Sequence, residues 1–226
     1  MGPYAFSTAQ AEPRCRLCRR FDPPFARATA YGPYDGGLRE LIHLLKYQQV
    51  RPAAKVLGRM LAEAIAASQA SVGDTPLLVV PVPLHSRKLH QRGFNQAELI
   101  AQAALKLKPL AGELTLGRGI LIRQRETKSQ IGFTRFERRE NLLGAFLVAK
   151  PRDVEGREIL LVDDVFTTGT TVSECARVLR RAGATRVWVA TVARTLKDDA
   201  ARALPAATKA RQTVETGLAL AAGEHS

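Results

Sequence analysis

Apolar residues recur at helical intervals over two stretches of the chain, and a capping residue marks the start of a third. Between residues 38 and 45, Leu and Ile lie three and four positions apart with charged residues between them, and a second stripe runs from Val56 to Ile65. The third stretch runs from Asn95, a residue type that caps helix N-termini, to Leu105. We predict a helix over each stretch, with its apolar side facing a core.

Short apolar runs bounded by prolines, glycines or polar residues predict buried strands. Five such runs cover residues 77–83, 120–122, 144–148, 159–162 and 187–192. A further amphipathic helix is predicted from Val172 to Leu179, closed by Gly183. Strands that alternate with helices indicate an α/β fold, in which helices flank a mainly parallel sheet.

The two ends of the chain lack these patterns. Residues 1–35 contain five prolines, and we predict a small irregular N-terminal segment there. Residues 205–226 are alanine-rich and weakly patterned, and we expect a mobile tail. One α/β domain, residues 36–204, is therefore predicted between them. Within it, residues 85–93 have the composition of a basic loop, and residues 106–119 that of a turn-rich connection.

Composition excludes two broad classes of protein. The chain has 226 residues, 46% of them hydrophobic and 24% charged, which is typical of a globular domain and excludes wholesale disorder. No run approaches the roughly 20 apolar residues of a membrane-spanning helix, and residues 1–10 lack an apolar leader. We therefore expect no membrane insertion and a cytoplasmic location. A net charge of +13 predicts an acidic partner, which could be nucleic acid, a membrane surface or a polyphosphate.

Three cysteines, an odd number, do not suggest a disulfide framework. Cys175 lies within a predicted helix, where it is expected to pack as a small apolar residue. Cys15 and Cys18 form the single C-x-x-C of the chain. A tetrahedral structural zinc site needs four nitrogen or sulfur ligands, and this pair supplies two of them. We therefore expect no zinc.

Residues 159–171 carry the strongest chemical signal. The predicted strand leads into two acids, Asp163 and Asp164, and a polar turn then leads directly into a helix. The turn and the helix start supply Thr167, Thr168, Gly169, Thr170 and Thr171. Backbone N–H groups at a helix start bind phosphate, and carboxylates bind sugar hydroxyls or Mg²⁺. The combination predicts a site for a ribose 5-phosphate.

Other interpretations of this segment are weaker. A solvated Asp-Asp cap on a generic threonine-rich turn is the main alternative, but the apolar strand before it and the patterned helix after it favour a binding site. An ATP-type P-loop is excluded because no lysine follows Gly169, and the dinucleotide fingerprint G-x-G-x-x-G is absent.

These thirteen residues resemble the phosphoribosyl-pyrophosphate (PRPP) binding motif of type I phosphoribosyltransferases. The resemblance implies that Asp163 and Asp164 contact the ribose hydroxyls and that residues 167–171 bind the 5-phosphate. It also implies that Mg²⁺ arrives with PRPP, with Asp163 or Asp164 as its candidate protein ligand.

A protein that binds PRPP must also hold the pyrophosphate group, which requires cations. Arg87, Lys88 and Arg92 follow the first predicted strand of the sheet, and we expect them to surround the pyrophosphate. Taken alone, the same residues are also consistent with an ordinary basic surface loop.

Residues 118–139 form a second Arg-rich segment. It predicts a loop that closes over a polyanion and excludes water. Arg125 and Lys128 of this segment are candidate catalytic residues, together with Asp163 and Asp164. Taken alone, the segment is also consistent with a solvated or nucleic-acid-facing stretch.

Several segments together resemble the ComF/GntX-like branch of the phosphoribosyltransferases, which is associated with bacterial DNA uptake (competence). Besides the PRPP motif, the matching pieces are residues 34–39, 44–47, 81–83, 92–96, 125–130, 138–141 and 144–146. Members of this branch usually carry two C-x-x-C pairs near the start, resembling a small zinc knuckle. Here only Cys15 and Cys18 are present, so either a pair was lost or the sequence begins downstream of the true start.

Two functions remain open at this stage. The first is a Mg²⁺-dependent phosphoribosyltransferase that uses PRPP and an unidentified acceptor. The second is a non-catalytic accessory protein of DNA uptake, which would bind DNA or a motor protein through its basic surface. Aromatic residues make up only 6% of the chain, which argues against a base-stacking platform for single-stranded DNA. A homodimer is a further candidate assembly.

Overall fold

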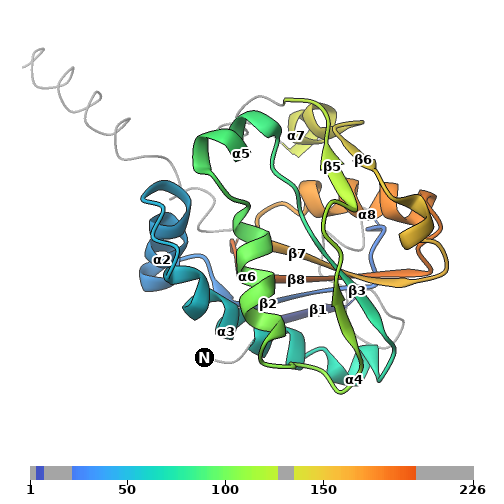
Figure 1. The fold of residues 1–226 in the computed structure, drawn as a ribbon, viewed down its shortest axis with the longest axis horizontal. Helices are drawn as coiled ribbons and strands as arrows, with labels where there is room; N and C mark the ends of the chain where they lie inside the picture. The colour runs from blue at the N-terminus through green and yellow to red at the C-terminus, as the bar shows by residue number, and fades with distance from the viewer. Residues whose placement is uncertain (1–3, 8–21, 127–134, 197–226) are drawn as a thin grey trace, which may run out of the picture. The chain divides into compact units, whose positions relative to one another are not determined.

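The computed structural model describes residues 4–7, 22–126 and 135–196. Its main sheet has six strands (Figure 1). In spatial order they are β1 (Tyr4–Ser7), β2 (Arg27–Pro33), β8 (Arg186–Arg194), β7 (Glu158–Phe166), β3 (Leu77–Pro81) and β4 (Leu114–Leu116). The pair β1–β2 is antiparallel and every other neighbouring pair in this sheet is parallel. Two further strands, β5 (Leu121–Arg123) and β6 (Phe146–Val148), pair with each other.

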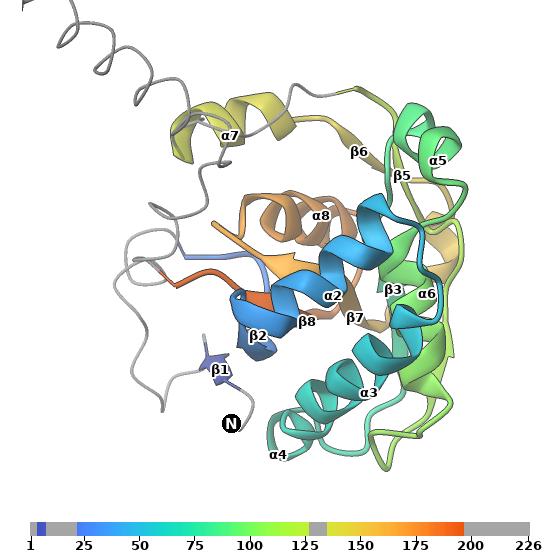
Figure 2. The same cartoon turned by 90° about the vertical axis from the view of Figure 1, so that its left-hand side faces the viewer.

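Helices cover both faces of the sheet, so the predicted α/β fold with a mainly parallel sheet is confirmed. One face packs against α2 (Gly36–Tyr47), α3 (Ala53–Ala66) and α6 (Gln96–Leu105), which lie side by side in Figure 2. The other packs against α8 (Thr170–Arg181) and the β5–β6 pair. The remaining helices are α4 (Gln69–Val72), α5 (Ser86–Arg92), α7 (Arg135–Leu142) and a 3₁₀ turn at Pro151–Asp153.

Strand β7 shows how the sheet divides the core. Leu160 and Val162 pack in the layer of α3 and α6, whereas Ile159 and Leu161 pack in the layer of α8. This alternation follows from the two-residue period of a strand, in which successive side chains point to opposite faces. Beyond Val162 the alternation shifts, because Val165 packs in the layer of α3 and α6 and Phe166 in the layer of α8.

The helices predicted near residues 38–45, 56–65, 95–105 and 172–179 are all present. Asn95 caps α6 as expected, because its side chain accepts a hydrogen bond from the Ala97 N–H at 3.0 Å. Cys175 is fully buried in the layer of α8, as predicted. Among the residues that the structure describes, no helix is long and apolar enough to cross a bilayer.

The prediction of an irregular segment over residues 1–35 is wrong in part. Residues 27–33 form β2, which pairs with β8 and buries Ala28, Thr29 and Ala30. The apolar pattern did not predict this strand, because its buried residues are small. Pro33 does not interrupt it, because this residue stands at the last position of the strand. Residues 4–7 form a second strand, β1, at the edge of the sheet.

Two other local predictions are corrected. Residues 86–92, predicted as a basic loop, form α5, and residues 114–116 of the predicted turn-rich connection form the edge strand β4. Helix α5 has no buried residue, so it lacks the apolar stripe by which a helix is found in a sequence. The fold described here belongs to one compact unit, Met1–Thr195. The tail predicted at 205–226 lies outside the described residues.

Candidate functional site

Strands β3 and β7 lie side by side and are parallel, so both end at the same edge of the sheet. A cavity of about 270 Å³ opens at this edge. Four cationic side chains line it: Lys46, Lys88, Arg92 and Arg123. Two carboxylates, Asp163 and Asp164, line it too. In open parallel sheets, ligands bind outside the carboxyl ends of the strands, and the surplus of cations here suits an anion.

Asp163 and Asp164 lie inside strand β7, which runs on to Phe166 rather than ending before the acids. Asp164 points to the layer of α2, where Lys46 Nζ lies 2.8 Å from its Oδ2 atom. Asp163 acts electrostatically on buried Cys175 of α8, which puts it toward that layer, and its Oδ1 atom accepts the backbone N–H of Asp164 at 2.9 Å. The cavity therefore has an acid from each layer.

Burial and, after it, the neighbouring Asp164 carboxylate raise the pKa of Asp163 from 3.8 to about 7. Lys46 and Arg123 oppose this rise, because a nearby positive charge favours the carboxylate. Asp163 can therefore hold or release a proton close to neutral pH. Such perturbed acids concentrate at functional sites, although ion-pair networks also produce them.

Lys46 is a site residue that the sequence did not assign. It belongs to the 44–47 piece of the family resemblance, but nothing in that piece places it beside an acid of β7. Burial by itself would lower the pKa of Lys46, but the Asp164 carboxylate at 2.8 Å outweighs burial and raises it. Lys46 therefore stays positively charged. Arg123, at the end of β5, is a second lining cation that the sequence left without an individual role.

The predicted phosphate-binding residues form the turn between β7 and α8 and the first turn of that helix. Gly169 has a φ of +75°, and a Cβ there would lie 2.7 Å from Phe166 Cζ, so this position requires glycine. Thr171 lines the cavity. Thr168 and Thr170 are joined by a hydrogen bond of 2.7 Å between their hydroxyl oxygens, and Thr167 is exposed. The first N–H groups of a helix lack acceptors within the helix, so the start of α8 can donate to a phosphate.

Only two of the three basic residues predicted to surround a pyrophosphate line the cavity. Lys88 and Arg92 of α5 line the cavity. Arg87 is exposed and instead lies 3.3 Å from Glu126, measured between Nη1 and Oε1. Burial lowers the pKa of Lys88, and the positive charges of Arg123 and Arg92 lower it further. An added anion would relieve this crowding of like charges.

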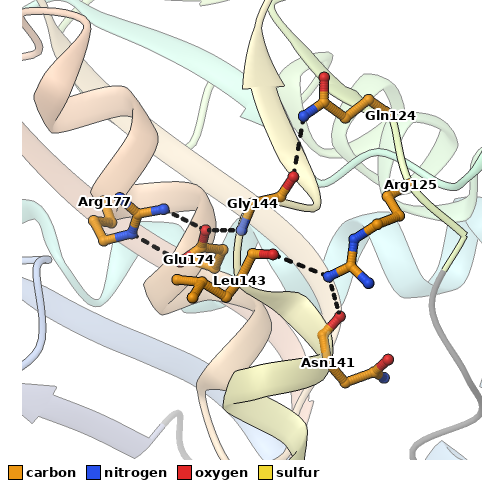
Figure 3. Close-up of polar contacts among 7 residues, drawn as sticks. All are labelled: Gln124, Arg125, Asn141, Leu143, Gly144, Glu174 and Arg177. Atoms are coloured by element: carbon orange, nitrogen blue, oxygen red, sulfur yellow. Dashed lines mark hydrogen bonds and ion pairs between the residues drawn. The ribbon is translucent and has the colours of Figure 1, made fainter.

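The side chain of Arg125 is hydrogen-bonded to backbone carbonyl groups and does not line the cavity. Its Nη2 atom donates to the carbonyl oxygens of Asn141 and Leu143, each at 2.9 Å (Figure 3). These bonds join the end of β5 to the turn after α7. Lys128, the other predicted catalytic residue of this segment, lies outside the described residues.

The same turn is held from the opposite side by α8. Glu174 is buried and accepts the N–H of Gly144 at 3.0 Å (Figure 3). Arg177 donates to both carboxylate oxygens of Glu174, and these contacts lower the pKa of this acid although burial opposes them. Glu174 and Arg125 therefore hold one turn between them, and the catalytic role expected for Arg125 stays a prediction.

Two lining residues of the cavity carry oxygen atoms of the type that binds Mg²⁺. Asp163 and Asp164 bring carboxylate oxygens to the cavity, which is the ligand type that Mg²⁺ prefers. Among the described residues, no group of three or more His, Cys, Asp and Glu side chains is placed to hold a metal. Cys15 and Cys18 lie outside those residues, so the expectation about zinc stays a prediction.

One domain family and several proteins are similar to this chain. A sequence model of the phosphoribosyl transferase domain matches residues 57–215. The DNA utilization protein YhgH of Salmonella typhimurium is 36% identical over 185 residues, which covers 80% of this chain and 78% of that protein. Competence protein F of Haemophilus influenzae is 31% identical over 182 residues, with the same coverage of 80% and 78%. Competence protein ComFC of Bacillus subtilis is 26% identical over 151 residues, covering 66% of this chain and 56% of that protein.

Proposed function

This chain belongs to the ComF-like branch of the type I phosphoribosyltransferases, and we propose that its cavity binds PRPP together with Mg²⁺. One observation carries the proposal. Two carboxylates and four cations line a single cavity at the carboxyl edge of the sheet, next to the helix start at Thr170. Carboxylates suit sugar hydroxyls, whereas cations and helix N–H groups suit phosphates.

Each part of PRPP has a proposed partner in this arrangement. The 5-phosphate binds the turn of residues 167–171, and the ribose hydroxyls bind Asp163 and Asp164. The pyrophosphate binds Lys88 and Arg92, and Arg123 lines the same cavity. Arg87 is left out of this set because its side chain is directed to Glu126.

The residues present fit a magnesium ion that arrives with the ligand. Asp163 and Asp164 supply hard oxygen donors, and phosphate oxygens would complete the coordination. When bound, Mg²⁺ neutralises charge on the pyrophosphate.

Transfer of the phosphoribosyl group is the reaction proposed for this site. Pyrophosphate would leave the anomeric carbon while positive charge develops on the ribose and negative charge on the leaving group. Lys88 and Arg92 stabilise the leaving group, because fixed cations in a cavity interact strongly with developing charge. The protein contributes mainly orientation and electrostatics. The acceptor is not identified by any lining residue.

The names of the relatives suggest a cellular setting. Proteins called DNA utilization protein YhgH and competence protein F are 36% and 31% identical to this chain, so we propose that it acts in DNA uptake or utilization. The second candidate function is an accessory role, in which the net charge of +13 engages DNA or a motor protein without catalysis.

Pyrophosphate release separates the two functions. Purified protein would be incubated with Mg²⁺, PRPP and single acceptors from a panel of purine, pyrimidine and amine compounds. We expect one acceptor to give release that is lost in Asp163→Asn. No release with any acceptor, combined with DNA binding that weakens steeply with salt and survives Asp163→Asn, would favour the accessory role.

A further inference from the structure

The acid pair of the cavity is accompanied by a cation from a distant part of the chain. Lys46 stands near the end of α2, and its Nζ atom lies 2.8 Å from Asp164 Oδ2. Both side chains are mostly buried, with 19% and 11% of their side-chain surface exposed, and both line the cavity. The charge of Lys46 also acts on Asp163, but the contact at 2.8 Å is with Asp164.

Two carboxylates in a binding site disfavour a polyphosphate ligand, because both are negatively charged. Each carboxylate repels the phosphates, and the repulsion is stronger in a partly buried site than in water. Lys88, Arg92 and Arg123 come from α5 and β5, whereas Lys46 comes from α2 and contacts an acid directly. A cation held against one acid removes most of that acid's repulsion while leaving its second oxygen for other contacts.

We propose that Lys46 is a positioning residue that acts as the internal counter-ion of Asp164, so that the cavity accepts the phosphates of its ligand. This inference rests on the proposed function, because it concerns the same site. Lys46 acts through Asp164: it cancels the charge of that carboxylate and fixes its direction. In this role it makes no contact with the ligand itself.

The ion pair is not required to anchor α2. Ile42 and Leu45 of this helix are 1% exposed and belong to the core that contains α3 and α6. Apolar burial of this kind stabilises a helix against a sheet, whereas a buried ion pair adds little net stability. The placement of Lys46 at the cavity therefore calls for a reason other than packing.

Direct contact between Lys46 and a phosphate is the competing role, and a double-mutant comparison distinguishes the two. The comparison uses Asp164→Asn alone and Asp164→Asn combined with Lys46→Met. Both proteins lack the Asp164 carboxylate, so neither leaves that buried charge without its ion-pair partner, and Asp163 is the same in both. The dissociation constant for PRPP with Mg²⁺ is measured for each by calorimetry, next to the wild-type protein and Lys46→Met.

Counter-ion action predicts that Lys46→Met weakens PRPP binding about tenfold or more in the wild-type background. In the Asp164→Asn background the same substitution changes the dissociation constant less than about threefold. Lys46→Arg keeps the charge and is expected to retain most of the affinity.

Two results would overturn the inference. One is an equal loss of affinity in both backgrounds, which would make Lys46 a direct ligand contact. The other is unchanged affinity in Lys46→Met. Absence of PRPP binding by the wild-type protein is a different result, because it removes the proposed function itself and the inference with it.

Discussion

The carboxylates of Asp163 and Asp164 belong to consecutive residues of β7 yet lie in different layers of the protein. Asp164 contacts Lys46 at 2.8 Å, whereas Asp163 points toward the layer that holds Arg123 and Cys175. Both acids still reach one cavity because they lie near the end of the strand. They are therefore expected to differ in chemistry, and each can be tested separately.

Asp163 is expected to make stability depend on pH. Its pKa is about 7 in the folded protein and 3.8 ordinarily, so the folded protein keeps this proton between these values while the unfolded chain has lost it. The contribution is therefore fully present below about pH 4 and is lost as pH rises toward 7. The loss is at most about 1.4 kcal/mol per pH unit.

Urea denaturation of the wild-type protein and Asp163→Asn at pH 5, 6, 7 and 8, in the presence of EDTA, measures how Asp163 changes the free energy of unfolding with pH. The variant cannot titrate at this position, so its free energy of unfolding should rise relative to wild type between pH 5 and 7 and then level off. A constant difference over that range would contradict the assignment.

Gly169 is expected to tolerate no side chain. Gly169→Ala forces a φ of +75° on alanine and puts its Cβ 2.7 Å from Phe166 Cζ. Strain of about 1 kcal/mol and crowding of about 1–3 kcal/mol should lower the free energy of unfolding. Gly119→Ala is the matched control, because Gly119 has a φ of +65° and open space around it. Equal losses in the two variants would show that contact with Phe166 is unimportant.

Arg92 and Arg87 lie on the same helix but are expected to differ in ligand binding. Arg92 lines the cavity, so Arg92→Ala should weaken PRPP binding about tenfold, as for a lost hydrogen bond to a charged group. Arg87 pairs with exposed Glu126, so Arg87→Ala should change the dissociation constant less than about twofold. Calorimetric titration of both variants checks this, and the reverse order would move the pyrophosphate site away from the cavity wall.

Arg125 is expected to affect stability more than ligand affinity. Arg125→Ala removes two bonds to the carbonyls of Asn141 and Leu143, which should cost about 1 kcal/mol of unfolding free energy. Hydrogen exchange of the Gly144 and Ala145 amides should accelerate, because the turn loses the two hydrogen bonds from Arg125. A large loss of PRPP affinity with unchanged exchange would instead return Arg125 to the site, as the sequence first suggested.

The sequence predicted those parts of the fold that carry strong apolar patterns. Strand β3 was found because its buried residues form a continuous run of large apolar side chains, and helix α6 because Asn95 marks its start. Strand β2 was missed because small residues such as Ala28 and Ala30 give little hydrophobic signal. Helix α5 was missed because it buries nothing.

The candidate site was predictable only where it is continuous in sequence. Residues 163–171 form one continuous segment, so their residue types were enough to predict a binding site there. Lys46 reaches Asp164 through the packing of α2 against the sheet, a relationship that no local pattern contains. The strand was expected to end at residue 162, whereas its pairing with β8 continues to Phe166.

Binding of PRPP itself tests the central claim most directly. Isothermal titration of Mg²⁺-PRPP into the wild-type protein, with ribose 5-phosphate as a weaker competitor, reports whether the cavity takes a phosphorylated sugar. We predict saturable binding to one site per chain, and a loss of at least about tenfold when Asp163 and Asp164 are both changed to Asn. An absence of binding, or equal affinity in that double variant, would contradict the account.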